Sequence, residues 1–152
     1  MVKARPLVSL RARALRALAR RELSRAELKA KLTPHLAEAD DLEALLDDLQ
    51  KRGWLSDARA AEQIVQIRSA RFGTQRIAHE LRQKGISEEL INASIPKMKE
   101  GELEAARAVW HRKFATPAQD QKEKAKQVRF LQSRGFSMEV IFKVMKISDD
   151  EN

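Results

Sequence analysis

The segment Lys84-Gly85-Ile86-Ser87-Glu88-Glu89-Leu90-Ile91 returns fifty positions later as Arg134-Gly135-Phe136-Ser137-Met138-Glu139-Val140-Ile141. Each copy holds a basic residue, a glycine, a large apolar residue, a serine and an aliphatic pair. Glycine accepts the left-handed conformation that follows many helix ends, and the serine can cap the next helix. The apolar residue between them can pack the corner against the core. A repeat of this period predicts tandem helical units that bury their apolar faces together.

The helix stops and starts divide the chain into three units of similar length. We predict an all-α fold of three tandem three-helix repeats in an elongated, curved arrangement. The first repeat, with its basic amino-terminal segment, covers residues 1–55, the second 56–100 and the third 101–147. Residues 148–152 form an acidic tail that we expect to be frayed.

Individual residues predict where several helices begin, end and face the core. Ser24 with Glu27 has the spacing of a capping box. Asp57 is expected to cap the fourth helix, in which Ile67 is expected to face inward. Pro96 is expected to end the sixth helix, because the residue before a proline is biased away from the helical region.

Composition excludes several classes of protein. Apolar residues make up 43% of the 152 residues, which suffices for a core, whereas aromatic residues make up 5%. The absence of cysteine excludes disulfides and thiolate chemistry. No apolar run approaches the roughly 20 residues of a membrane span, and the basic amino terminus lacks the apolar region of a secretory signal. We therefore expect a cytoplasmic protein that does not bind membranes.

Positive charge is concentrated toward the amino terminus. The net charge is +8, and the first 31 positions contain only Glu22 and Glu27 as acidic residues. The basic residues there are Lys3, Arg5, Arg11, Arg13, Arg16, Arg20, Arg21, Arg25, Lys29 and Lys31. The following stretch reverses sign, with Glu38, Asp40, Asp41, Glu43, Asp47 and Asp48. Such a basic segment favours nucleic acid or another acidic surface as partner, with a solvated helix face as the alternative.

The sequence contains no constellation of catalytic or metal-binding residues. His35, His79 and His111 are far apart, and none has a partner at metal-ligand spacing. The five glycines are scattered and form no phosphate-cradling loop. Trp54 and Trp110 are interpreted as core or corner residues rather than base-stacking platforms. We predict no catalytic residues, no metal, no cofactor and no small-molecule substrate.

A longer stretch places basic side chains before, at and after a helix corner at Gly73. It reads Arg68-Ser69-Ala70-Arg71-Phe72-Gly73-Thr74-Gln75-Arg76-Ile77-Ala78-His79-Glu80-Leu81-Arg82-Gln83-Lys84-Gly85-Ile86. One interpretation is a positively charged ridge formed by the helix pair. The other is the solvated exterior of a helical hairpin.

This stretch, preceded by Gly53-Trp54-Leu55-Ser56-Asp57, resembles the RecX family of bacterial recombination regulators. The segment from Ala19 to Leu32 fits the first-unit motif of that family. Arg112-Lys113-Phe114 and Phe130-Leu131-Gln132-Ser133-Arg134-Gly135-Phe136 fit the third unit. The ordered set covers about residues 10–146. The family pattern usually has Tyr-Gly-Pro where this chain has Phe72-Gly73-Thr74.

The resemblance implies three three-helix repeats and a function. It implies a non-enzymatic regulator that binds the RecA filament along its groove and inhibits filament growth, ATPase and strand exchange. That role belongs to DNA recombination, DNA repair and the SOS response. We expect the partner contacts to be made by Arg20, Arg21, Arg25, Lys29, Lys31, Arg68, Arg71, Arg76, Arg82, Lys84, Arg112, Lys113 and Arg134.

The rival hypothesis is a helical DNA-binding protein that acts directly on single- or double-stranded DNA. Three helices with tight corners resemble helix-turn-helix units, and a charge of +8 attracts any duplex. No helix, however, shows a cluster of Asn, Gln and Arg suited to reading base edges. The sequence leaves open whether the basic residues meet acidic protein groups or phosphates.

Overall fold

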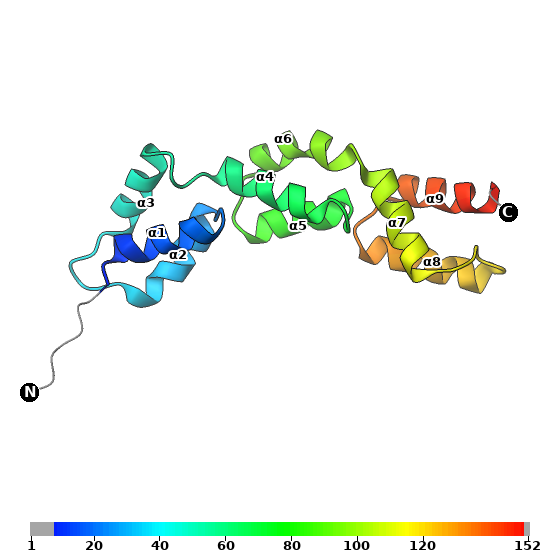
Figure 1. Cartoon of the computed structure of the whole chain (residues 1–152), viewed down its shortest axis with the longest axis horizontal. Coiled ribbons are helices and arrows are strands. Elements are labelled where there is room, and N and C mark those ends of the chain that lie inside the picture. Colours follow the sequence, from blue (N-terminus) through cyan, green and yellow to red (C-terminus); the bar gives the residue numbers. More distant parts are fainter. Residues whose placement is uncertain (1–7, 151–152) are drawn as a thin grey trace, which may run out of the picture.

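The computed structural model describes residues 8–150, with side chains described up to residue 146. This part of the chain is helical and contains no strand. The α-helices are α1 (Leu10–Arg20), α2 (Arg25–Leu32), α3 (Leu42–Lys51), α4 (Asp57–Arg68), α5 (Thr74–Gln83), α6 (Glu88–Lys99), α7 (Glu102–Lys113), α8 (Gln121–Ser133) and α9 (Met138–Asp150), and a short 3-10 helix, η1 (Thr33–His35), follows α2. They form three groups of three along one long axis (Figure 1).

Each group of three helices encloses its own small core. Leu28, Leu46 and Leu49 are fully buried in the first unit. Equivalent core positions recur about fifty residues apart. The last turns of the second helix of each unit hold a leucine that is 1% exposed or less, namely Leu32, Leu81 and Leu131. The three cores are separate clusters, so the placement of the units depends on the contacts between them.

The predicted helix starts are largely confirmed. The Ser24 hydroxyl accepts a hydrogen bond from the Glu27 N–H, and the Glu27 carboxylate accepts one from the Ser24 N–H, which completes the capping box. The expectation that Asp57 caps α4 is wrong. Ser56 has the extended backbone of a cap and accepts from the Arg59 N–H at 3.2 Å, which leaves the Asp57 carboxylate free to bond elsewhere.

Two expectations for the second unit are also wrong. Pro96 lies inside α6, which continues to Lys99. The carbonyl that Pro96 leaves without a helical donor belongs to Asn92, which is exposed, so water can bond to it. The buried side chain of Met98 holds the final turn against the core. Ile67 is 61% exposed, whereas Ile64 on the same helix is buried.

The second helices of successive units meet end to end. The Gly73 N–H at the start of α5 donates to the carbonyl of Arg134 at the end of α8 (2.8 Å), and the Gln75 N–H donates to the carbonyl of Gly135 (3.1 Å). The contact is so close that a Cβ on Gly73 would lie 2.4 Å from the Gly135 oxygen. Free donors of one helix end therefore satisfy free acceptors of another.

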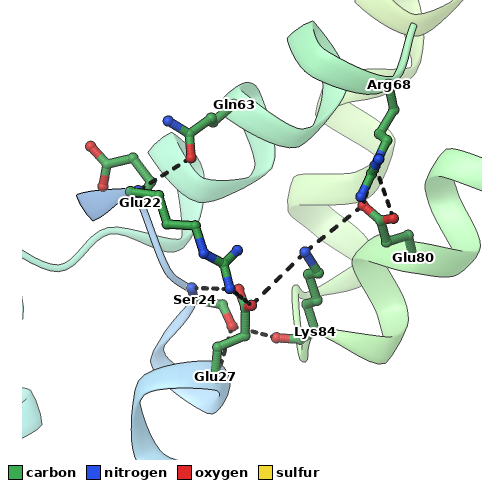
Figure 2. A network of polar contacts seen from close by, with 8 residues as sticks. Glu22, Ser24, Glu27, Gln63, Arg68, Glu80 and Lys84 are labelled. Carbon is green, nitrogen blue, oxygen red and sulfur yellow. Dashed lines mark hydrogen bonds and ion pairs between the residues drawn. The ribbon is translucent and has the colours of Figure 1, made fainter. Parts of the chain in front are cut away.

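The junction between the first and second units repeats this arrangement. The Ser24 hydroxyl at the start of α2 donates to the carbonyl of Lys84 at the end of α5 (2.5 Å), as Figure 2 shows. Gly85, in the left-handed conformation at φ +77°, lies against Ala26. The order α8, α5, α2 thus places a carboxyl end against an amino end twice, which is the favourable alignment of helix dipoles.

An acidic first residue strengthens each junction. The Asp57 carboxylate, in the first turn of α4, accepts the Arg25 N–H at 2.7 Å. The Glu102 carboxylate, in the first turn of α7, accepts the Thr74 N–H at 3.2 Å and the Thr74 hydroxyl at 3.0 Å. Glu102 is only 6% exposed. A negative group therefore caps the amino end of α2 and of α5 from the unit that follows.

The end-to-end arrangement makes the molecule longer than a globule. A compact chain of this length has a radius of gyration of about 15 Å. We expect small-angle X-ray scattering to give a clearly larger value at low protein concentration. A radius at the compact value would contradict the separated cores.

The junction glycines should be more sensitive to substitution than a glycine in open space. Gly53 and Gly135 both have positive φ, but a Cβ on Gly53 meets nothing within 4 Å, whereas one on Gly135 lies 2.5 Å from the Arg76 backbone nitrogen. Gly53→Ala should lower the free energy of unfolding by about 1–2 kcal/mol. Gly135→Ala should cost about 1–3 kcal/mol more, because the second unit must move away. Urea denaturation measures both, and equal losses would show that the junction yields freely.

Candidate partner-binding surface

Several predicted contact residues of the first unit are paired with acidic groups of the same unit. Arg25 on α2 contacts Glu43 at 2.8 Å and Asp47 at 2.7 Å, both on α3. Lys29 contacts Glu43 at 2.7 Å. Hydrogen bonds from Lys29 and then from Arg25 lower the pKa of the Glu43 carboxyl. These two cations link α2 to α3, so their charge is largely compensated.

Other cations of the first unit lack such partners. Arg13, Arg16, Arg20 and Lys31 surround a shallow hollow of about 170 Å³ between α1 and α2, with His35 at its edge. Among the described residues, none of these four cations has a carboxylate within 4.0 Å. We call these four residues the amino-terminal basic patch. Arg20 and Lys31 are among the predicted contact residues and Arg13 and Arg16 are not, although the spacing of 13, 16 and 20 marks one helix face.

The predicted residues at the first junction belong to an ion-pair network. Figure 2 shows Glu80 between Arg68 (3.1 Å) and Lys84 (3.9 Å), with Lys84 reaching on to Glu27 (3.9 Å). Arg21 also contacts Glu27, at 3.5 Å. Of these contacts, the one between Lys84 and Glu27 joins the first unit to the second, whereas Arg68 and Arg21 pair within their own units.

Arg82 is paired in a similar way on the second unit. Its guanidinium donates to the Glu88 carboxylate, which raises the pKa of Arg82 and lowers that of Glu88. Both groups are exposed, so this pair is screened by solvent and contributes little to stability.

The remaining predicted residues converge at the boundary of the second and third units. Arg71, Arg112, Lys113 and Arg134 line a hollow of about 320 Å³, whose apolar lining is Val109 and Phe130. No carboxylate of the described residues lies within 4.0 Å of these four cations. We call this feature the carboxy-terminal basic hollow. It draws on α7, α8 and the segments that follow α4 and α8, so the fold brings together residues up to 63 positions apart.

Two phenylalanine rings lie between three of the cations near this boundary, Arg76, Arg134 and Lys113. The Arg76 guanidinium lies 4.5 Å from the centre of the Phe72 ring, and that of Arg134 lies 5.6 Å from the same ring. Arg134 also lies 5.2 Å from the Phe130 ring, which Lys113 approaches to 5.6 Å. Cations and rings therefore alternate in a row, at distances typical of cation–π contacts. We call this row the cation–aromatic ladder.

The core of the third unit and the second junction fix the ladder in place. Phe130 packs edge-on against the buried ring of Phe114, with centroids 5.4 Å apart. Arg76 donates to the carbonyl of Ser133 at 3.0 Å. The charged groups are therefore held before any partner arrives.

The two tryptophans and His111 have structural surroundings, whereas His35 and His79 are exposed. Trp110 is 2% exposed, and its indole N–H donates to the buried Gln127 amide oxygen at 3.0 Å. Trp54 lies at the corner after α3 with two guanidinium groups over its ring, those of Arg11 and Arg52. His111 packs edge-on against Trp110. Within residues 8–150, no three potential ligands lie close enough to hold a metal ion.

A larger hollow lies between α4 and α6 and has a different character. It measures about 600 Å³ and is lined by Ala58, Ala61, Glu62, Val65, Gln66, Leu90, Ala93, Ser94 and Lys97. None of the predicted contact residues contributes to it. In the part of the chain that the structure describes, no helix is long and apolar enough to cross a membrane.

Known proteins match this sequence over its whole length. Residues 56–95 match the family pattern "RecX, second three-helix domain" and residues 100–145 match "RecX, third three-helix domain". The regulatory protein RecX of Leptothrix cholodnii is 46% identical over 152 residues, which are 100% of this chain and 97% of that protein. The chain belongs to the RecX family. The regulatory protein RecX of Ralstonia nicotianae is 43% identical and covers 98% of this chain, with 94% of its own length matched.

The fold agrees with that assignment. The crystal structure of RecX from Lactobacillus salivarius superposes with a TM-score of 0.78 and covers 92% of this chain and 94% of its own. The two chains are 18% identical, so the likeness concerns the fold. The resemblance found in the sequence and the all-α fold of three-helix repeats are both confirmed.

The ion pairs between α2 and α3 should respond to pH. Because the folded-state pKa of Glu43 is lowered, its link to Lys29 is present at neutral pH and is lost as the pH falls through that lowered value. Replacing Lys29 with Met should raise the Glu43 pKa toward its ordinary value. Side-chain NMR titration measures this shift, and Lys51→Met removes an equal charge as a control. An unchanged Glu43 pKa in Lys29→Met would show that the pair does not form.

Proposed function

We propose that the protein is a non-enzymatic regulator that binds the RecA filament and inhibits its growth, ATPase and strand exchange. Membership of a family whose proteins are named regulatory protein RecX supports a RecA-related role. The observation that carries the proposal is the division of the cations into compensated and uncompensated groups. The uncompensated ones face solvent on an elongated body, where they can meet an acidic surface.

The positions of the two uncompensated groups suit an extended partner. The amino-terminal basic patch lies on the first unit, and the carboxy-terminal basic hollow lies where the second unit meets the third. A repeat protein presents such surfaces along its length because each unit packs only on its neighbours. We assign the main contacts to the predicted residues without a carboxylate partner, Arg20, Lys31, Arg71, Arg76, Arg112, Lys113 and Arg134. The paired cations Arg21, Arg25, Lys29, Arg68, Arg82 and Lys84 contribute through the overall positive field.

Direct DNA binding is the alternative that the same charges support. Phosphates would be attracted by the basic patch and the hollow as readily as carboxylates are. The two functions differ in stoichiometry. A regulator that acts at filament ends or in the filament groove works below the amount that covers the DNA, whereas a competitor for DNA must occupy the lattice.

Charge removal at uncompensated sites should impair inhibition of RecA more than the same loss at compensated sites. Arg16→Ser with Arg20→Ser should raise the concentration for half-inhibition of the RecA ATPase on single-stranded DNA by about tenfold. Arg68→Ser with Arg82→Ser removes the same charge from paired positions and should change it less. Both changes lie on exposed side chains, so a circular dichroism melt should confirm that the proteins stay folded.

The same titration decides between the two functions. We expect the wild type to inhibit at concentrations well below those that saturate the DNA. Inhibition only near DNA saturation, with mutant effects that follow bare DNA affinity, would favour the DNA-binding alternative. Equal effects of the two double substitutions would mean that only net charge matters.

A further inference from the structure

The carboxy-terminal basic hollow combines a cationic rim with an apolar floor. Four cations surround it, and Val109 and the half-buried ring of Phe130 line it. Its volume of about 320 Å³ admits one large side chain. A ligand that fills it must therefore supply both negative charge and an apolar group. A phosphate or a carboxylate alone would leave the floor exposed to water.

The Phe130 ring in this hollow and the neighbouring Phe72 ring of the ladder are unsuited to stacking with nucleic-acid bases. Arg76 and Arg134 lie over the Phe72 ring, and Arg134 and Lys113 lie over the Phe130 ring. Single-stranded nucleic acid gains much of its affinity from bases stacked on free aromatic faces. Here the chain's own cations take those positions. The charges also converge on one hollow rather than following a strand.

We propose that the carboxy-terminal basic hollow binds an acidic protein segment that carries one large apolar side chain. That side chain contacts Val109 and the part of Phe130 that lines the hollow, away from the ring face under Arg134 and Lys113, and carboxylates on either side of it pair with the cations of the rim. Guanidinium groups match the two oxygens of a carboxylate in a fork that ammonium groups do not offer. The assignment of this segment to the RecA filament rests on the function proposed above.

The ladder lowers the cost of binding such a segment. Arg134 lies between two rings, and its main-chain carbonyl is bound by the Gly73 N–H. A long side chain that is already ordered loses less conformational entropy when a partner binds. Because Arg112 and Lys113 are exposed and lack a carboxylate partner within the described residues, no internal ion pair must break first.

A direct binding experiment on the full-length protein tests the site. The probe is a fluorescein-labelled peptide in which one leucine is flanked on both sides by glutamates, followed by fluorescence anisotropy. Two competitors of equal charge are a peptide with serine in place of leucine and an oligothymidylate. We expect the leucine peptide to bind at least about tenfold more tightly than either competitor, because only it fills both the rim and the floor.

Two matched double substitutions locate the binding. Arg112→Ser with Lys113→Ser should weaken the binding of the leucine peptide at least about tenfold. Lys122→Ser with Lys126→Ser removes the same charge from exposed positions of α8 outside the hollow and should change the affinity by less than about threefold. Circular dichroism confirms that both proteins are folded.

The outcomes separate this inference from the proposed function. Equal binding of the leucine and serine peptides, tighter binding of the oligothymidylate, or equal losses in the two variants would each overturn it. If the wild type inhibits RecA but does not bind the peptide, the hollow has been assigned the wrong ligand and the regulatory function stands. If it binds the peptide but does not inhibit RecA, the acidic segment must come from a different protein.

Discussion

The end-to-end contact between the second helices of successive units determines how the three small cores are placed. Both junctions contain hydrogen bonds between helix ends. At the second one, the Gly73 and Gln75 N–H groups satisfy the carbonyls of Arg134 and Gly135, and Glu102 binds the remaining donor at Thr74. Because each helix end lacks partners within its own helix, the two ends complete one another. The same logic repeats with Ser24, Lys84 and Asp57.

The two junctions have similar geometry, but the side chains beside them differ in charge. At the first junction Lys84 lies near the carboxylate of Glu27. Glu27 corresponds in the repeat to Arg76, 49 positions later, and Lys84 corresponds to Arg134, 50 positions later. An ion pair at the first junction is therefore replaced by two arginines at the second. The Phe72 ring between them supplies negative π density to both guanidinium groups, which allows like charges to gather where the fold needs close contact.

The sequence predicted most of the local features, although the roles of Asp57, Pro96 and Ile67 were wrong, and it left out those that depend on distant contacts. The glycine stops at Gly85 and Gly135 were predicted, and both have positive φ, because a helix stop followed by a cap lies within a few residues. The tight approach of Gly73 to Gly135 was missed, since it depends on a contact across 62 positions. At position 74, where the family pattern usually has proline, the chain has a threonine whose N–H reaches Glu102. A proline has no N–H to offer there.

The candidate surface shows the same limit. The sequence identifies the basic residues. Whether the charge of each is compensated depends on which acidic side chains the fold brings close to it. Arg25 and Arg71 look alike in the sequence, yet Arg25 lies between Glu43 and Asp47 and Arg71 opens onto the hollow. A count of basic residues therefore overstates the positive charge that the first unit can offer to a partner. Most of the uncompensated cations among the predicted residues lie near the second junction. There the Arg134 carbonyl accepts a hydrogen bond that joins the units, while the Arg134 side chain belongs to the ladder. Since those two roles use different atoms, the guanidinium can be removed without breaking the hydrogen bond that joins the units.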